Sequence, residues 1–212
     1  MYKHIIFDFG GVFLYLGKKN NENHGYHFYL VNEFSKKYGV PRGKIAKMFE
    51  AHHNRLHTGR ETPKQFLALV DKRFNKNLDV NAVHLEWKKR HRLRKEEINW
   101  KLVRYMQHLK KRYKVHMFSN AIDLNYTPDP KWLLRLQGNF DSIFMSYKEK
   151  IKKPDRSAFI YVLKKIKAKP EECIFVDDLR QNVAAANKIG IKSFLFVNVD
   201  KLKSDMAKEN II

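Results

Sequence analysis

Five short apolar runs stand out along the chain, because hydrophobic and polar residues hardly alternate within them. Such runs are typical of parallel β-strands that are covered on both faces. Between them, apolar residues recur every three or four positions over residues 98–109, 159–166 and 183–189, which predicts helices. Alternating strands and helices predict an α/β fold with a doubly wound, Rossmann-like parallel sheet. The predicted strands are His4–Phe9, Lys114–Ser119, Ser142–Met145, Cys173–Val176 and Lys192–Val197.

Residues 16–95 break this pattern, since they contain no convincing strand and at least three amphipathic helical stretches. The third stretch has the clearest start. Thr62 can cap it, Pro63 suits the first helical position, and Gln65 completes a capping box. Because this block directly follows the first predicted strand, we expect a helical domain of residues 16–95 inserted into a core of residues 1–15 and 96–212.

The chain is strongly basic, with 43 Lys and Arg against 22 Asp and Glu and a net charge of +21. Residues 16–95 hold 19 of these basic residues and only 7 acidic ones, which gives +12. The run from Lys88 to Lys95 fits either a return linker or a solvated helix end. The charge as a whole fits either a polyanionic partner or a lysine-rich solvated surface. Nucleic acid, an anionic membrane and a phosphorylated substrate are the polyanions to consider.

Cys173 is the single cysteine and lies in an apolar run, so no disulfide can form within the chain. We expect a buried thiol and a reducing compartment. The apolar stretch near the N-terminus is ended by Asp8, which makes it too short for a signal peptide or a membrane span. We therefore expect a cytoplasmic protein without membrane contacts.

Polar residues follow four of the predicted strands. In doubly wound sheets, ligands bind beyond the carboxyl ends of the strands, so these residues should meet at one edge. Together they would present carboxylates, a hydroxyl and a lysine, which suits a metal ion and a phosphoryl group. The segments are Asp8-Phe9-Gly10-Gly11-Val12, Ser119-Asn120, Lys152-Lys153-Pro154-Asp155 and Asp177-Asp178-Leu179-Arg180-Gln181-Asn182.

In order and position, these four segments resemble the signature motifs of the haloacid dehalogenase (HAD) superfamily. The helical insertion resembles the small cap of its subfamily I, and residues 59–66 are similar to a segment of such caps. The pattern Asp-x-Gly-x-Val at Asp8 resembles the branch that contains α-glucose-1-phosphate phosphatases, and Ser119-Asn120 fits that branch too. The resemblance implies a Mg²⁺-dependent phosphoric monoester hydrolase that acts on a small phosphorylated substrate, for example a sugar phosphate.

The resemblance also implies catalytic roles. Asp8 would be the nucleophile and form an aspartyl-phosphate, which splits one difficult step into two. Ser119 would donate a hydrogen bond to the phosphate, and Asn120 and Gly11 would help to bind it. Lys153 would neutralise both the phosphate and Asp8. Lys153 is preferred over Lys152 because the family lysine directly precedes a proline.

The metal ligands implied by the resemblance are Asp8, the Gly10 carbonyl and Asp178. All three offer oxygen, which Mg²⁺ prefers. Asp177 would lie behind these ligands. Asn182 stands where many relatives have an acidic residue, and it would orient a Mg²⁺-bound water.

Gly10 departs from the family pattern. Most HAD phosphatases have an aspartate two residues after the nucleophile, where it serves as general acid and base. General acid–base help is worth about 10²–10⁴-fold in rate. Relatives in the resembling branch have a further aspartate seven residues after the nucleophile, but here Tyr15 occupies that position. The sequence therefore shows no obvious substitute acid.

Other functions stay open beside the small-molecule phosphatase that we favour. One is a phosphatase for nucleotides or nucleic-acid ends, and another is a HAD scaffold of weak or no activity that binds a partner such as RNA. Phosphonate cleavage would need a cap lysine. Dehalogenation is disfavoured, because the dehalogenases do not keep the paired acids found at Asp177 and Asp178.

Histidines in the helical insertion allow two interpretations. His53 and His57 are four residues apart, which suits a zinc pair, but no third ligand is in register. We prefer a position of this helix facing the active site.

Overall fold

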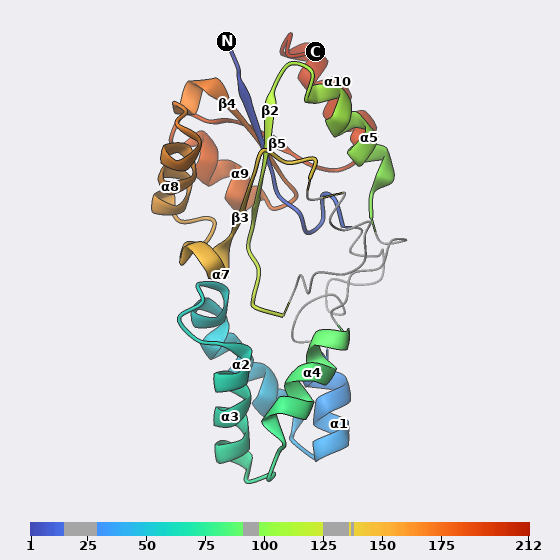
Figure 1. Ribbon diagram of the computed structural model, residues 1–212, viewed down its shortest axis with the longest axis vertical. Coiled ribbons are helices and arrows are strands. Elements are labelled where there is room, and N and C mark those ends of the chain that lie inside the picture. Colours follow the sequence, from blue (N-terminus) through green and yellow to red (C-terminus); the bar gives the residue numbers. More distant parts are fainter. Residues whose placement is uncertain (15–28, 91–97, 125–135, 137) are drawn as a thin grey trace.

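Five parallel strands form the central sheet (Figure 1). The computed structural model describes residues 1–14, 29–90, 98–124, 136 and 138–212. The sheet order is β3-β2-β1-β4-β5, so the chain winds outward from β1 in both directions. This confirms the predicted α/β fold and all five strands, two of which end earlier than predicted. The strands are β1 (His4–Phe7), β2 (Lys114–Ser119), β3 (Ser142–Met145), β4 (Cys173–Asp177) and β5 (Lys192–Leu195).

Helices cover both faces of the sheet, which explains why the strands are largely apolar. Helices α8 (Arg156–Ile166) and α9 (Arg180–Asn187) cover one face, and α5 (Trp100–Leu109) and α10 (Val199–Lys208) cover the other (Figure 1). Successive residues of β1 face opposite layers. Ile6 packs with the α8 and α9 side, whereas Ile5 and Phe7 pack with the α5 and α10 side. Cys173 is free and fully buried at the start of β4, as expected.

The strand register brings the polar strand ends to the same level. Phe7 pairs with Val176, so Asp8 and Asp177 emerge side by side. The Asp8 N–H donates to the Val176 carbonyl at 2.9 Å, which extends this pairing by one residue. On the other side of β1, Ser119 at the end of β2 pairs with Met145 at the end of β3.

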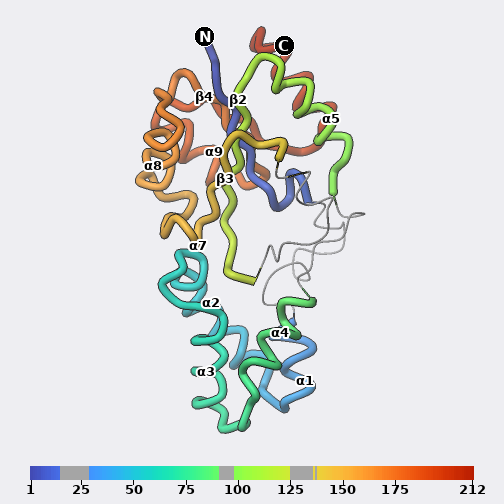
Figure 2. Tube along the Cα trace, in the orientation of Figure 1, coloured from blue at the N-terminus to red at the C-terminus, as the bar shows by residue number. Residues whose placement is uncertain are grey.

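A block of helices lies at the carboxyl end of the sheet (Figures 1 and 2). It has its own buried cluster, which includes Phe34, Phe66 and Trp87. Ile122 and Leu124 from the segment after β2 belong to the same cluster. Both predicted boundaries of the inserted domain fall outside the described residues. The block contains the π-helical turn η1 (Tyr29–Phe34) and the helices α1 (Ser35–Tyr38), α2 (Arg42–His57), α3 (Pro63–Phe74) and α4 (Val80–Arg90).

Helix α3 begins as its sequence predicts. The Thr62 hydroxyl accepts from the Gln65 N–H at 3.2 Å, and the Gln65 side chain accepts from the Thr62 N–H at 2.8 Å. The helices that were not predicted include α4 and α10 (Val199–Lys208). The basic residues Lys88 to Arg90 form the last turn of α4, while residues 91–95 of that run lie outside the described residues.

The helical block meets the sheet domain at α7 (Ser146–Glu149), which directly follows β3. Gly59, in the loop between α2 and α3, has a φ of +62° and lies against the main chain of Tyr147. A Cβ atom at position 59 would come within 2.1 Å of the Tyr147 carbonyl oxygen. Both the backbone conformation and this contact therefore require glycine.

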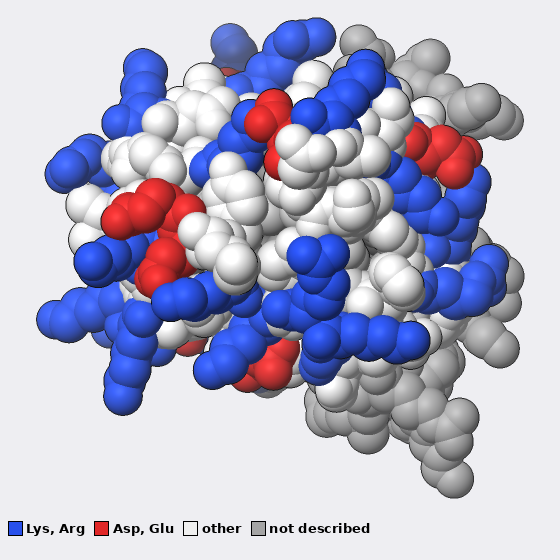
Figure 3. Space-filling model, turned by 90° about the horizontal axis from the view of Figure 1, so that it is seen from above, with Lys and Arg blue, Asp and Glu red and all other residues white. Residues whose placement is uncertain are grey.

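Figure 3 shows the end of the molecule that carries both termini, where basic side chains alternate with acidic and uncharged ones. Three of the lysines there are paired, Lys3 with Glu172, Lys110 with Asp141 and Lys192 with Glu209. None of the helices within the described ranges has the length and apolar character needed to cross a membrane.

Two buried histidines lie on adjacent strands at the amino end of the sheet. His4 Nδ1 and His116 Nε2 are 3.0 Å apart, so one ring donates and the other accepts, and both are neutral. Burial lowers the pKa of His116 to about 4 and also lowers the pKa of His4. In the unfolded chain a histidine titrates near 6.5. Between about pH 4 and pH 6.5, the unfolded state therefore binds more protons at His116 than the folded state does.

We predict that this pair destabilises the fold in acid. As pH falls from 7 to 4, His116→Gln should lose less free energy of unfolding than the wild type. Each proton that the folded state excludes costs at most about 1.4 kcal/mol per pH unit. Urea unfolding at several pH values measures the difference, and His108→Gln, at an exposed position of α5, is the matched control. Parallel pH profiles for His116→Gln and the wild type would contradict this account.

Candidate active site

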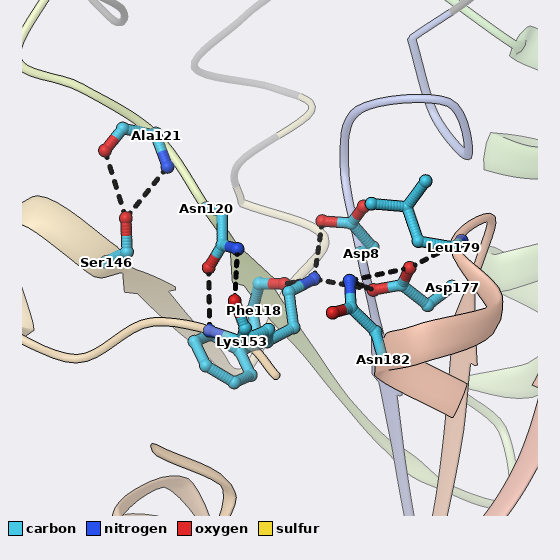
Figure 4. Close-up of polar contacts among 9 residues, drawn as sticks. All are labelled: Asp8, Phe118, Asn120, Ala121, Ser146, Lys153, Asp177, Leu179 and Asn182. Atoms are coloured by element: carbon cyan, nitrogen blue, oxygen red, sulfur yellow. Dashed lines mark hydrogen bonds and ion pairs between the residues drawn. The ribbon is translucent and has the colours of Figure 1, made fainter. Parts of the chain in front are cut away.

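The ammonium group of Lys153 lies at the centre of the polar cluster beyond the strand ends (Figure 4). Its Nζ lies 2.8 Å from Asp8 Oδ1, 2.7 Å from Asp177 Oδ2 and 2.8 Å from the Phe118 carbonyl oxygen. The contacts to Asp177 and Phe118 are hydrogen bonds, and the contact to Asp8 is an ion pair. The side chain is only 1% exposed, and its Nζ lies 5.2 and 5.4 Å from the ring centroids of Phe118 and Phe175. The structure thus places Lys153, the preferred lysine of the two, against the carboxylates.

Asn120 holds the main chain of Lys153. Its Nδ2 donates to the Lys153 carbonyl at 2.8 Å, and its Oδ1 accepts from the Lys153 N–H at 2.9 Å. Ser146 makes a second link of the same kind, because its hydroxyl lies 2.8 Å from the Ala121 N–H and 3.0 Å from the Ala121 carbonyl. Both links join the segment after β2 to the segment after β3. The Asn120 side chain is therefore engaged with Lys153, and its predicted role in phosphate binding stays a prediction.

Three carboxylates converge beside Lys153. Asp8, Asp177 and Asp178 each place one oxygen within 4.8 Å of the others. Burial raises the pKa of Asp8 to about 7, although Lys153 opposes the shift. Burial and the charge of Asp177 likewise raise the pKa of Asp178 to about 6. Burial alone would lower the pKa of Lys153, but Asp8 and Asp177 outweigh it, and the pKa is raised. One ammonium group thus faces three carboxyl groups.

Asp177 is fully occupied by its protein neighbours. Its Oδ1 accepts from the Leu179 N–H at 2.8 Å, and its Oδ2 accepts from Lys153. The Asn182 amide nitrogen lies 3.0 Å from both oxygens. The carbonyl oxygen of Asn182 is buried and has no hydrogen-bond partner among the described residues. A buried acceptor of this kind fits a water molecule on a neighbouring cation.

The two adjacent glycines after β1 have opposite surroundings. Gly11 has a φ of +74°, and a Cβ atom there would lie 2.1 Å from Asp178 Oδ2. Asp178 can therefore approach Asp8 only because position 11 has no side chain. At Gly10, by contrast, a Cβ atom would meet nothing within 4 Å. The glycine at position 10 is not explained by packing against a neighbour.

A divalent cation fits this cluster. Three carboxylates converge on a single lysine, and the pKa values of two of them, Asp8 and Asp178, are raised; a cation would relieve this crowding of negative charge. Oxygen ligands of this kind suit Mg²⁺. Among the described residues, His/Cys/Asp/Glu ligands converge in this way only at this cluster. The ring centroids of His53 and His57 lie 4.1 Å apart, but no third ligand among the described residues joins them, so zinc at this pair is not supported.

Sequence reasoning missed some members of the cluster. The Phe118 carbonyl and the Leu179 N–H are main-chain groups, which no residue type reveals. Ser146 begins a short helix, and nothing in its sequence context predicts a link to Ala121. Ser119, which the sequence did single out, is buried at the end of β2. His57 is also buried, at the end of α2, where burial, His53 and Lys152 lower its pKa to about 3.

The chain is similar to known proteins over most of its length. The model of the haloacid dehalogenase-like hydrolase family matches residues 2–190. A sesquiterpene phosphatase of Aspergillus oryzae is 46% identical over 52 residues, which is 24% of this chain and 26% of that protein. Flavin mononucleotide hydrolase 1 of Arabidopsis thaliana is 31% identical over 96 residues, which is 45% of this chain and 38% of that protein. A drimenol cyclase of Aspergillus calidoustus is 40% identical over 67 residues, 32% of this chain, so the chain spans only 13–38% of these relatives.

Solved structures share the fold at low sequence identity. A HAD-like hydrolase from Porphyromonas gingivalis has a TM-score of 0.74 at 23% identity and covers 99% of this chain and 98% of its own. A HAD family enzyme from Bacteroides thetaiotaomicron, in complex with magnesium and inorganic phosphate, has a TM-score of 0.70 at 20% identity, covering 95% and 99%. A 2-haloacid dehalogenase from Pseudomonas syringae has a TM-score of 0.66 at 14% identity, covering 99% and 100%. These likenesses show the fold, and the fold is common to different activities.

The glycine pair gives a prediction for metal binding. Saturating Mg²⁺ should stabilise the wild type, by about 2.7 kcal/mol at 100 times its Kd. Gly11→Ala should abolish this gain, because the new methyl group displaces Asp178. Gly10→Ala should keep it, since that methyl group meets nothing. Thermal unfolding with Mg²⁺ and with chelator measures both variants. Equal Mg²⁺ stabilisation of Gly11→Ala and the wild type would show that Asp178 is not needed for the metal.

Proposed function

Because this chain belongs to the haloacid dehalogenase-like hydrolase family, we propose that it is a Mg²⁺-dependent phosphatase of small phosphorylated molecules. The observation that carries the proposal is the convergence of three carboxylates on one buried lysine at the carboxyl ends of the strands. Such a cluster can bind a divalent cation and a phosphoryl group together. We also propose that residues 16–95 act as a helical cap over this site.

Asp8 is the nucleophile in this proposal. Lys153 holds its Oδ1 at 2.8 Å, which fixes the carboxylate and favours its ionised form. A bond forms between the carboxylate oxygen and phosphorus while the bond from phosphorus to the leaving oxygen breaks. Water then hydrolyses the aspartyl-phosphate, which releases inorganic phosphate and restores Asp8. Two easier steps replace one difficult step.

Lys153 acts mainly as an electrostatic and structural centre. Its ammonium group already donates to Asp177 and Phe118 and pairs with Asp8, so it is held away from other partners. Its positive charge offsets the repulsion between Asp8 and an incoming phosphate. Direct phosphate contacts fall to Ser119 and the main chain at Gly11.

Asp8, Asp178 and the Gly10 carbonyl would hold Mg²⁺, with Asp177 and Asn182 behind them. When bound, the cation offsets negative charge on the phosphoryl oxygens. Asp177 suits the position behind the ligands, because both of its oxygens already accept hydrogen bonds. Asn182 suits the contact to a cation-bound water, because its carbonyl oxygen is buried and lacks a partner among the described residues.

A metal-dependent phosphatase explains this cluster better than a dehalogenase does. Three carboxylates packed together beside one lysine suit a cation. The two curated relatives named as a phosphatase and a mononucleotide hydrolase support phosphate chemistry. Both are named for small organic molecules, which supports a small substrate.

We predict that Asp8→Asn is inactive. The amide keeps the shape but cannot attack phosphorus, so Mg²⁺-dependent hydrolysis of 4-nitrophenyl phosphate should fall by about 10⁴-fold or more. Chelator should abolish wild-type activity. Beryllium fluoride, which mimics a phosphoryl group on a carboxylate, should stabilise the wild type and not the variant. Asp200→Asn, on the exposed side of α10, is the control. An active Asp8→Asn would mean that another residue is the nucleophile.

We also predict that Asn120 positions Lys153. Asn120→Ala removes two hydrogen bonds to the Lys153 main chain, and misplacement of a catalytic group by 1 Å can cost about 10²-fold in rate. The matched control is Ser146→Ala, which breaks the neighbouring link to Ala121 without touching Lys153. Both variants should lose about 1–3 kcal/mol of stability. Only Asn120→Ala should lose activity, and equal activity losses would assign both links a purely structural role.

A further inference from the structure

The position at which the family resemblance implies a proton donor is a glycine in this protein. Gly10 stands two residues after Asp8, and a Cβ atom there would meet none of the described residues within 4 Å. Its φ lies outside the left-handed region that favours glycine. The backbone and the surrounding space would therefore accept a side chain, yet none is present.

The other groups of the carboxylate–lysine cluster are already engaged. Lys153 donates hydrogen bonds to Asp177 and Phe118 and forms an ion pair with Asp8. Asn182 directs its amide nitrogen to Asp177, which in turn accepts from Leu179. Asp8 is the nucleophile, and Asp178 is a metal ligand in the proposed function. Within this cluster, no side chain is left to protonate a departing oxygen.

From this arrangement, and resting on the proposed phosphatase function, we infer the class of substrate. The enzyme acts on phosphoric anhydrides and on phosphate esters of acidic hydroxyls, and discriminates against simple alkyl phosphates. The Asp8 oxygen bonds to phosphorus, the phosphorus–oxygen bond of the leaving group breaks, and its electron pair departs on the leaving oxygen as an anion. Only a weakly basic oxygen leaves readily without a proton. Anomeric sugar phosphates fall between the aryl and alkyl extremes, because the anomeric hydroxyl is more acidic than an ordinary alcohol.

The missing side chain at position 10 also affects the second chemical step. The water that attacks the aspartyl-phosphate must lose a proton, and position 10 offers no base to take it. With a good leaving group, the first step is therefore fast and the second slow. The aspartyl-phosphate should accumulate, and product should appear in a burst. For this reason the leaving-group effect is read from kcat/KM or from the burst rate, because slow hydrolysis of the intermediate hides it in kcat.

The experiment is a leaving-group series on the wild type and two variants. The substrates are 4-nitrophenyl phosphate, phenyl phosphate, acetyl phosphate, glucose 1-phosphate and glycerol 3-phosphate. Gly10→Asp supplies a carboxyl group, and Gly10→Asn supplies a side chain of the same size without an acidic proton. Mg²⁺ stabilisation is measured for each variant to show that the fold and the metal site persist.

We expect kcat/KM of the wild type to fall steeply from 4-nitrophenyl phosphate to glycerol 3-phosphate. Gly10→Asp should reduce the ratio of these two kcat/KM values by about 10²-fold or more, which is the usual contribution of a general acid. Gly10→Asn should leave this ratio as large as in the wild type. The wild-type series tests the inference even if both variants fail to fold.

Two results would overturn the inference while leaving the phosphatase intact. One is similar kcat/KM values for aryl and alkyl phosphates in the wild type, which would assign the proton to a residue outside this cluster, such as His57. The other is a Gly10→Asp variant that folds and binds Mg²⁺ but has the same ratio of aryl to alkyl kcat/KM as the wild type. If the wild type hydrolyses no phosphate in the series and does not bind beryllium fluoride, the proposed function itself is wrong.

Discussion

A buried ammonium group among carboxylates is the interaction on which the rest of this structure depends. Removing a charged lysine from water costs several kcal/mol, and only close, well-directed partners offset that cost. Lys153 finds them in Asp8 after β1, Phe118 in β2 and Asp177 in β4. These partners lie on three neighbouring strands, so the ammonium group is satisfied only once the sheet has formed. Formation of the core and assembly of the site are therefore one event.

Much of the fold follows from local rules that the sequence displays. Continuous apolar runs marked the five strands, and the Thr62 capping box marked the start of α3. The site residues Asp8, Asp177 and Lys153 could be predicted because parallel strands bring their carboxyl ends to one edge. Helices α4 and α10 were not predicted, although the apolar residues of α10 recur three and four positions apart and Asn198 caps its start. These apolar residues are Val199, Leu202 and Met206.

The finer arrangement of the site could not be predicted, because it depends on main-chain groups and on empty space. The Lys153 ammonium group donates to the Phe118 carbonyl, a main-chain group that no residue type encodes. Asn120 was expected at the phosphate, but its side chain is directed to the main chain of Lys153. Gly10 and Gly11 are both glycines, but for different reasons. Gly11 is required by the close approach of Asp178, whereas a Cβ atom at Gly10 would meet none of the described residues within 4 Å. Only the three-dimensional structure distinguishes these two surroundings.

The membership of Ile122 and Leu124 in the buried cluster of the helical block matters for protein engineering. In a chimaera that exchanges only residues 16–95 for the corresponding segment of another hydrolase, these two side chains would face a foreign surface. The segment from Ala121 to Leu124 would then need to travel with the graft. It begins directly after Asn120, so the donor and recipient would have to be joined within a few residues of the catalytic cluster. The helical block is thus less modular than its place in the sequence implies.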